Sequence, residues 1–136
     1  MADDRSDMVV GRVSPEEEGN LQELAQAVAA DLRFIGLKVE EAGDCFTGSV
    51  NLIEGFVVYY DPSSQDDEGG VFARWKPSAG LLDTVPKEGE PDTNQLYKSI
   101  NAMYEALRKI LEAAGWQVAE GDYEPAIKIS RKPKHI

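Results

Sequence analysis

The feature that most constrains this fold is a strict apolar repeat between residues 96 and 114. Six apolar residues follow one another at spacings of four and three: Leu96, Ile100, Met103, Leu107, Ile110 and Ala114. A second row runs beside them at spacings of seven: Tyr97, Tyr104 and Leu111. Two adjacent rows make an apolar stripe wider than a coiled-coil seam, which predicts one continuous helix lying on a sheet. Thr93 or Asn94 can cap its start, and Gly115 can end it.

The N-terminal part of the chain carries an explicit helix start. Ser14 and Glu17 have the spacing of a capping box, and Pro15 suits the first helical position. Apolar residues then recur at three- and four-residue spacing: Leu21, Leu24, Val28, Leu32 and Ile35. Gly36 is a natural stop after them. We therefore predict a first amphipathic helix between Ser14 and Gly36.

Alternating apolar and polar residues between and after these helices predict strands. We expect strands at residues 37–41, 45–53, 56–60, 71–76, 116–119 and 126–130, with turns at 42–44 and 120–122 and a long loop at 77–92. The alternation in residues 71–76 favours a sheet with one buried and one wet face. The predicted fold class is α+β, a mostly antiparallel sheet with two amphipathic helices, in the order α-β-β-β-β-α-β-β.

A length of 136 residues and an apolar share of 42% are typical of one folded domain. We expect a single domain over residues 1–136, with an ordered core at about 10–131 between a frayed acidic N-terminus and a frayed basic C-terminal tail. No segment resembles a signal peptide or a membrane span, so no membrane partner is expected. Cys45 is the only cysteine, which excludes an intramolecular disulfide and favours a reducing, cytoplasmic location.

The net charge of −11 is concentrated in the first half of the chain. Residues 1–70 hold four basic and sixteen acidic residues, a net charge of −12, whereas residues 71–136 hold ten basic and nine acidic residues, a net charge of +1. Such an excess favours solubility first and attraction to a basic partner second.

Few residues can carry catalysis or hold a metal. Asp44 precedes Cys45 and disfavours its thiolate, and the single histidine, His135, lies next to the terminus. One cysteine and one histidine cannot form a closed zinc site, and residues 61–70 lack the spacing of an EF-hand calcium loop. No glycine-rich phosphate cradle opens a helix. We therefore predict no catalytic, cofactor-binding or metal-binding residue, and the sequence favours a protein that is not an enzyme.

Two basic segments bear on nucleic-acid binding: residues 74–76 and the region from Lys128 into the tail. Phosphate binding needs a strong positive footprint, whereas the first helix is acidic. We interpret these segments as a wet strand face and a solubilising tail, and we do not expect a nucleic-acid partner.

The order of elements from Ser14 to Ser130, together with the low pI of about 4.5, resembles the small acidic chaperones of type III secretion systems. The shared features are a capped N-terminal helix, a run of antiparallel strands, a long apolar second helix and two more strands. The resemblance implies a homodimer that holds an extended partner chain. It matches no diagnostic motif, so it assigns no functional residue, and the final helix of that family is replaced here by a basic tail.

These observations favour a non-catalytic protein-interaction module, chaperone-like or adaptor-like and dimeric, whose partner is a basic or extended protein. We predict that Tyr59, Phe72, Arg74 and Tyr97 face the partner, because aromatic residues on otherwise polar faces are typical of interfaces. The alternative for the aromatic residues is that they complete the core.

Two other functions stay open at this point. An acidic decoy of a basic, nucleic-acid-binding surface would align Asp31, Glu40, Glu54 and residues 61–68 on one face. A small-molecule-binding or carboxylate-based enzyme domain would have a concave pocket beside residues 77–92, with a buried acid of raised pKa. The sequence does not distinguish the partner, the oligomeric state or the pathway.

Overall fold

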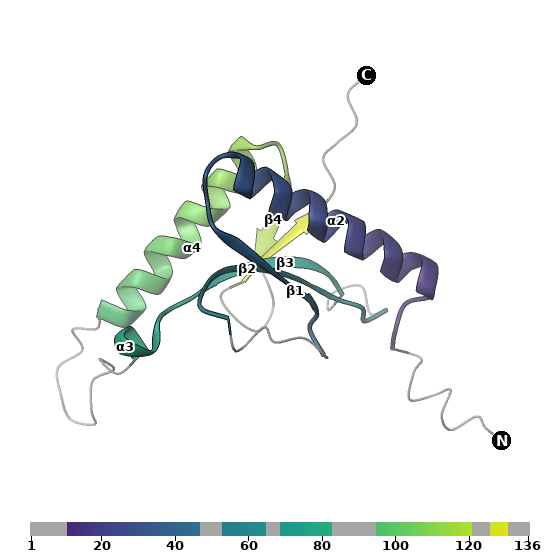
Figure 1. The fold of residues 1–136 in the computed structure, drawn as a ribbon, viewed down its shortest axis with the longest axis horizontal. Coiled ribbons are helices and arrows are strands. Elements are labelled where there is room, and N and C mark those ends of the chain that lie inside the picture. Colours follow the sequence, from purple (N-terminus) through teal and green to yellow (C-terminus); the bar gives the residue numbers. More distant parts are fainter. Residues whose placement is uncertain (1–10, 47–52, 65–68, 83–94, 121–125, 131–136) are drawn as a thin grey trace.

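The computed structural model describes residues 11–46, 53–64, 69–82, 95–120 and 126–130. Two long helices, α2 (Pro15–Phe34) and α4 (Gln95–Ala113), lie on one side of a five-stranded sheet (Figure 1). A short helix, α3 (Ala79–Leu82), precedes α4. The strands are β1 (Val39–Asp44), β2 (Gly55–Asp61), β3 (Gly70–Lys76), β4 (Gln117–Glu120) and β5 (Ile127–Ser130).

The strand order is β1-β2-β3-β5-β4, and only the β1–β2 pair of these five strands is parallel. The α+β class with a mostly antiparallel sheet is therefore confirmed. In the described ranges, three strands separate the two long helices, where we predicted four. Most of the predicted strand at 45–53 lies outside the described residues, and its first two residues, Cys45 and Phe46, form a turn.

The predicted turn at residues 42–44 is wrong, because these residues continue β1. The pairing of β1 with β2 shifts register between Glu41 and Gly43. Gly43 has a φ of 74°, a conformation that glycine adopts without steric strain, so the irregularity is absorbed as a bulge and the strand continues. The predicted loop at 77–92 contains α3, and its remainder from residue 83 lies outside the described residues.

Helix α2 starts as its sequence predicts. The backbone N–H of Glu17 donates to Ser14 Oγ at 3.2 Å, and the Ser14 N–H donates to Glu17 Oε1 at 3.3 Å, which completes the capping box. At the other end the helix stops at Phe34, and Gly36 turns the chain with a φ of 104°. Ile35 is the C-cap and is 53% exposed, so its predicted place in the buried row is wrong: the helix ends before that row reaches it.

Helix α4 is one continuous helix, as predicted, and it ends just before Gly115, whose φ is 99°. Its C-terminal half lies on the sheet, where Leu107 and Leu111 join the core cluster with Val71 and Ile129. The predicted caps Thr93 and Asn94, and most of the predicted turn at 120–122, lie outside the described residues.

The centre of the sheet is buried on both faces, so the predicted wet face is wrong at Phe72, while Arg74 and Lys76 on that face are half-buried. The helices cover the face that carries Val58, Tyr60, Val71, Ala73, Ile127 and Ile129. The opposite face carries a second buried cluster of Val57, Tyr59, Phe72 and Ala126. Alternation separates residues into two faces, but it does not show that either face is wet when both rows contain large apolar side chains.

None of the helices in the described part of the chain combines the length and the apolar character needed to cross a bilayer.

Candidate functional site

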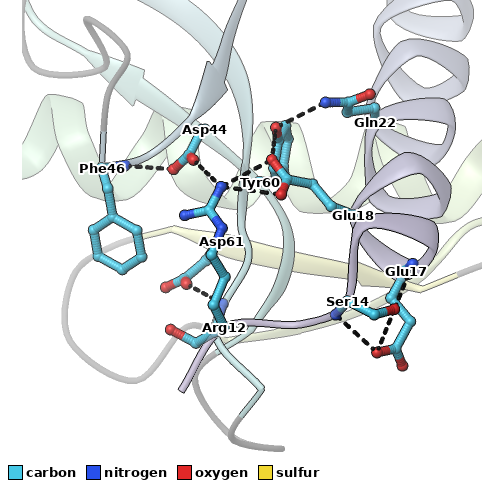
Figure 2. A network of polar contacts seen from close by, with 10 residues as sticks. Arg12, Ser14, Glu17, Glu18, Gln22, Asp44, Phe46, Tyr60 and Asp61 are labelled. Atoms are coloured by element: carbon cyan, nitrogen blue, oxygen red, sulfur yellow. Dashed lines mark hydrogen bonds and ion pairs between the residues drawn. The ribbon is translucent and has the colours of Figure 1, made fainter. Parts of the chain in front are cut away.

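The start of α2 meets the ends of β1 and β2 in a cluster of polar side chains (Figure 2). Arg12 Nη2 donates to both carboxylate oxygens of Glu18 at 3.0 Å and to Asp44 Oδ2 at 2.8 Å. The Tyr60 hydroxyl donates to Glu18 Oε2 at 2.7 Å and accepts from Gln22 Nε2 at 3.0 Å. One guanidinium thus joins α2 to the sheet through two carboxylates. We call these five residues the Arg12 cluster.

The bulge in β1 places Asp44 in this cluster. Before the bulge, Val39 and Glu41 pair with Phe56 and Val58, and an unbroken register would carry Gly43 to Tyr60. The inserted residue brings Asp44 opposite Tyr60 instead, on the face that α2 covers. Asp44 is only 8% exposed, and its second oxygen accepts from the Phe46 N–H at 2.8 Å. A buried carboxylate is thereby fully hydrogen-bonded.

The segment before α2 is also held by its backbone. The Val13 N–H donates to the Pro62 carbonyl at 2.7 Å, the Ser64 N–H donates to the Gly11 carbonyl, and Arg12 forms an isolated antiparallel bridge with Ser63. Together with the side-chain contacts, these bonds tie residues 11–14 to the end of β2. The Arg12 cluster therefore acts as a structural clasp between the chain entering α2 and the sheet.

The Cys45 thiol and the Tyr60 hydroxyl at this end of the molecule have raised pKa values. Burial, followed by the nearby carboxylates Asp61 and Asp44, raises the pKa of the Cys45 thiol to about 12. Burial is also the largest cause that raises the pKa of Tyr60, and the Glu18 carboxylate adds to it. A thiol that stays protonated at neutral pH is a poor nucleophile, so Cys45 is not activated for covalent catalysis.

Among the residues that the structure describes, no three His, Cys, Asp or Glu side chains are grouped so that they could hold a metal ion. In the acidic stretch 61–70, Asp61 Oδ1 accepts from the Ser63 N–H at 2.9 Å. The other three acids of this stretch, Asp66, Asp67 and Glu68, lie outside the described residues.

A shallow depression of about 360 Å³ lies between the first half of α2 and the connection from β2 to β3. Its lining includes Val13 and Leu21 on one side and Ser63 and Gly70 on the other. This depression is not the pocket expected for a small-molecule site, which was predicted beside residues 77–92. The buried carboxylate of the described residues, Asp44, does not line this depression and is already paired with Arg12.

The structure divides the four residues predicted to face a partner between two places, one face of the sheet and α4. Tyr59 and Phe72 are cross-strand neighbours whose rings stack at 5.6 Å between centroids, and both are buried, at 9% and 8% exposure. Arg74 pairs with Val57 on the same sheet face and is half-buried. Tyr97 lies on α4, on the helix side of the sheet, and is 56% exposed. Within this chain, Tyr97 is the aromatic residue of the four that solvent reaches.

Sequence reasoning missed two exposed aromatic residues, Phe34 and Phe46, which are 91% and 65% exposed. For Phe34 the signal was present in the helical spacing. It follows Glu23, Ala27 and Ala30 at spacings of four, three and four, which is the row on the polar side of α2. Phe46 follows β1 in a turn, and no pattern in the sequence predicts its exposure.

No protein-family model, curated protein or solved structure matches this chain.

Proposed function

We propose that this protein is a non-catalytic, chaperone-like interaction module of the cytoplasm that binds a partner protein through the first half of α4. The observation that carries the proposal is a gradient of burial along the Tyr97 row of the apolar stripe, beside a neighbouring row whose first residue, Leu96, is buried. Leu107 and Leu111 are 1% and 0% exposed, whereas Tyr97, fourteen residues before Leu111 on the same row, is 56% exposed. The Tyr97 row is thus buried only at its C-terminal end, where Leu111 joins the core cluster.

The binding surface consists of Tyr97, Ile100 and Met103, which we call the α4 surface. Ile100 and Met103 are half-buried and continue the stripe from Tyr97 toward the core. An apolar helix face of this kind is suited to a partner that lays an extended or helical segment along it, with an aromatic side chain as anchor. α4 belongs to the half of the chain, residues 71–136, whose basic and acidic residues nearly balance, at a net charge of +1.

The two other candidate functions have less support. The acids that a decoy would align lie on different sides: Asp31 is on α2, which covers one face of the sheet, whereas Glu40 pairs with Val57, which lies on the opposite face. A carboxylate-based enzyme needs a pocket that contains a buried acid with altered pKa, and the buried Asp44 is committed to the Arg12 cluster outside the depression. These arrangements favour the interaction module.

Site-specific photocrosslinking in the producing cell tests this proposal. A benzophenone amino acid replaces Tyr97 in one variant and Ala106 in another, since Ala106 is exposed on the opposite side of the same helix. We expect a discrete crosslinked protein at position 97 and none at position 106. Equal crosslinking at both positions, or none at position 97, would contradict the α4 surface as the binding site.

A further inference from the structure

The outer side of α2 changes character along its length. One row of exposed residues runs along it at spacings of four and three: Glu16, Asn20, Glu23, Ala27, Ala30 and Phe34. Its first half is acidic and its second half is uncharged. Phe34, at the end of the row, is 91% exposed, and Ile35 beside it is 53% exposed. This part of the surface is unusual in a region whose net charge is −12.

We propose that the second half of this row is the contact surface between two copies of this chain, packed antiparallel around a two-fold axis near Ala30. Phe34 is a large apolar projection, while the small side chains of Ala30 and Ala27, one and two turns before it, leave a low surface on the same face. The two-fold axis between the two copies places Phe34 of each copy over the alanines of the other. A surface that carries both the projection and the site that receives it is complementary to itself, as an isologous interface requires.

The distribution of charge along α2 also favours antiparallel packing of the two copies. Two molecules that each carry a net charge of −11 repel one another. The repulsion is weaker in an arrangement that keeps the acidic side chains of the two copies far apart. The antiparallel arrangement separates the two Glu23 side chains by roughly 20 Å and the two Glu16 side chains by roughly 40 Å, whereas a parallel one would set them side by side. It also directs Glu23 of each copy toward the end of the other α2, where Arg33 and then Lys38 follow in the sequence.

The nearby charges are already compensated within the chain. Arg33 donates to the Val39 carbonyl through Nε and Nη2, at 3.1 and 2.6 Å, and its Nη1 donates to Glu41 at 2.9 Å. Asp31 accepts from Trp116 Nε1 at 3.0 Å. Closing the contact therefore buries Phe34, Ile35 and the alanines without stranding a charge. One helix face is smaller than the interface of an obligate dimer, so we expect a reversible dimer that forms at roughly micromolar concentrations and above.

Sedimentation equilibrium of the purified full-length protein tests the contact. We expect a monomer–dimer equilibrium in the wild type, and a dissociation constant about tenfold or more higher in Phe34→Ser, because an apolar anchor is lost. The matched control is Tyr97→Ser, which removes an exposed aromatic from the α4 surface and should leave dimerisation unchanged. A wild-type monomer at all concentrations, or a dimer that Tyr97→Ser dissociates and Phe34→Ser does not, overturns the proposal. Binding of another protein at the α4 surface stands or falls separately.

Disulfide trapping tests the axis itself. In a Cys45→Ser background, Ala30→Cys should form an interchain disulfide readily, because a residue near the axis meets its own copy within bonding distance. Glu16→Cys, on the same row and roughly 40 Å from its counterpart, should not. Efficient crosslinking through position 16 and none through position 30 would exclude this arrangement. Circular dichroism of each variant checks folding; Ala30 and Glu16 are exposed, and the Cys45→Ser protein without further change is the reference for both.

Discussion

Arg12 and Asp44, thirty-two positions apart in the sequence, are joined by a 2.8 Å hydrogen-bonded ion pair that holds the start of α2 against the end of β1. The pair is asymmetric in its environment. The Arg12 side chain is 40% exposed, whereas that of Asp44 is 8% exposed. The carboxylate is therefore the member whose removal should affect stability more, because its replacement leaves a buried position with altered hydrogen bonding.

Asp44→Ala should lower the free energy of unfolding by about 2 kcal/mol, since it removes a buried acceptor of two hydrogen bonds, one of them to a cation. Asp44→Asn should cost less, because its amide oxygen can still accept from the Phe46 N–H. Urea denaturation measures both, with Glu40→Gln as the control on the exposed side of the same strand. Equal stability of the wild type and Asp44→Ala would show that the clasp contributes nothing.

Stability should also fall in alkali because of the tyrosines. The pKa values of Tyr60 and Tyr104 are raised above the ordinary 10.0, chiefly by burial. A raised pKa means that the folded protein holds these protons more tightly, so the stability is fully present below pH 10 and is lost as the pH rises through the folded-state values. Tyr60→Phe should reduce this loss. An unfolding free energy with the same dependence on pH above 10 in both proteins would contradict the assignment.

The thiol of Cys45 should react slowly. With its pKa raised from 9.0 to about 12, the thiolate is scarce at pH 8, and alkylation by iodoacetamide should be slower by orders of magnitude than in the urea-unfolded chain. Mass spectrometry of timed samples gives the two rates. Similar rates in the folded and unfolded protein would mean that folding does not raise the pKa of Cys45.

The gradient of burial along the Tyr97 row of α4 predicts that substitutions at its two ends change stability by different amounts. Leu111→Ala should destabilise the fold by about 2–5 kcal/mol, because it opens a cavity in the core. Tyr97→Ser should change stability by less than about 1 kcal/mol, since the side chain is more than half exposed. Thermal or urea unfolding distinguishes the two variants. A Tyr97→Ser variant as unstable as Leu111→Ala would place Tyr97 in the core.

The two helices were predictable because their signals are local. The capping box at Ser14 and the repeat from Leu96 depend on residues three or four positions apart, which is the scale at which a helix forms its contacts. The sheet was less predictable because its pairings join distant segments. Nothing near Gly43 indicates that β1 would pair in parallel with β2, or that the bulge would be absorbed within the strand.

The site was harder to predict than the fold. Phe72 lies on the more polar of the two alternating rows of β3, with Arg74 and Lys76, but whether that row meets water depends on what covers the sheet, which no local pattern reports. Arg12 precedes the first helix by only three positions, yet its partner Asp44 enters through the bulge. Exposure of Phe34 was available from the helical spacing, since its row begins with Glu16 and Glu23.

The most direct measurement of the central claim is the affinity of the protein crosslinked at position 97, purified and titrated by calorimetry into the wild type, Tyr97→Ser and Ala106→Ser. We expect Tyr97→Ser to weaken binding about tenfold or more, because an aromatic anchor is removed, and Ala106→Ser to bind as the wild type does. Unchanged affinity in Tyr97→Ser would contradict the assignment of the first half of α4 as the surface through which this protein binds its partner.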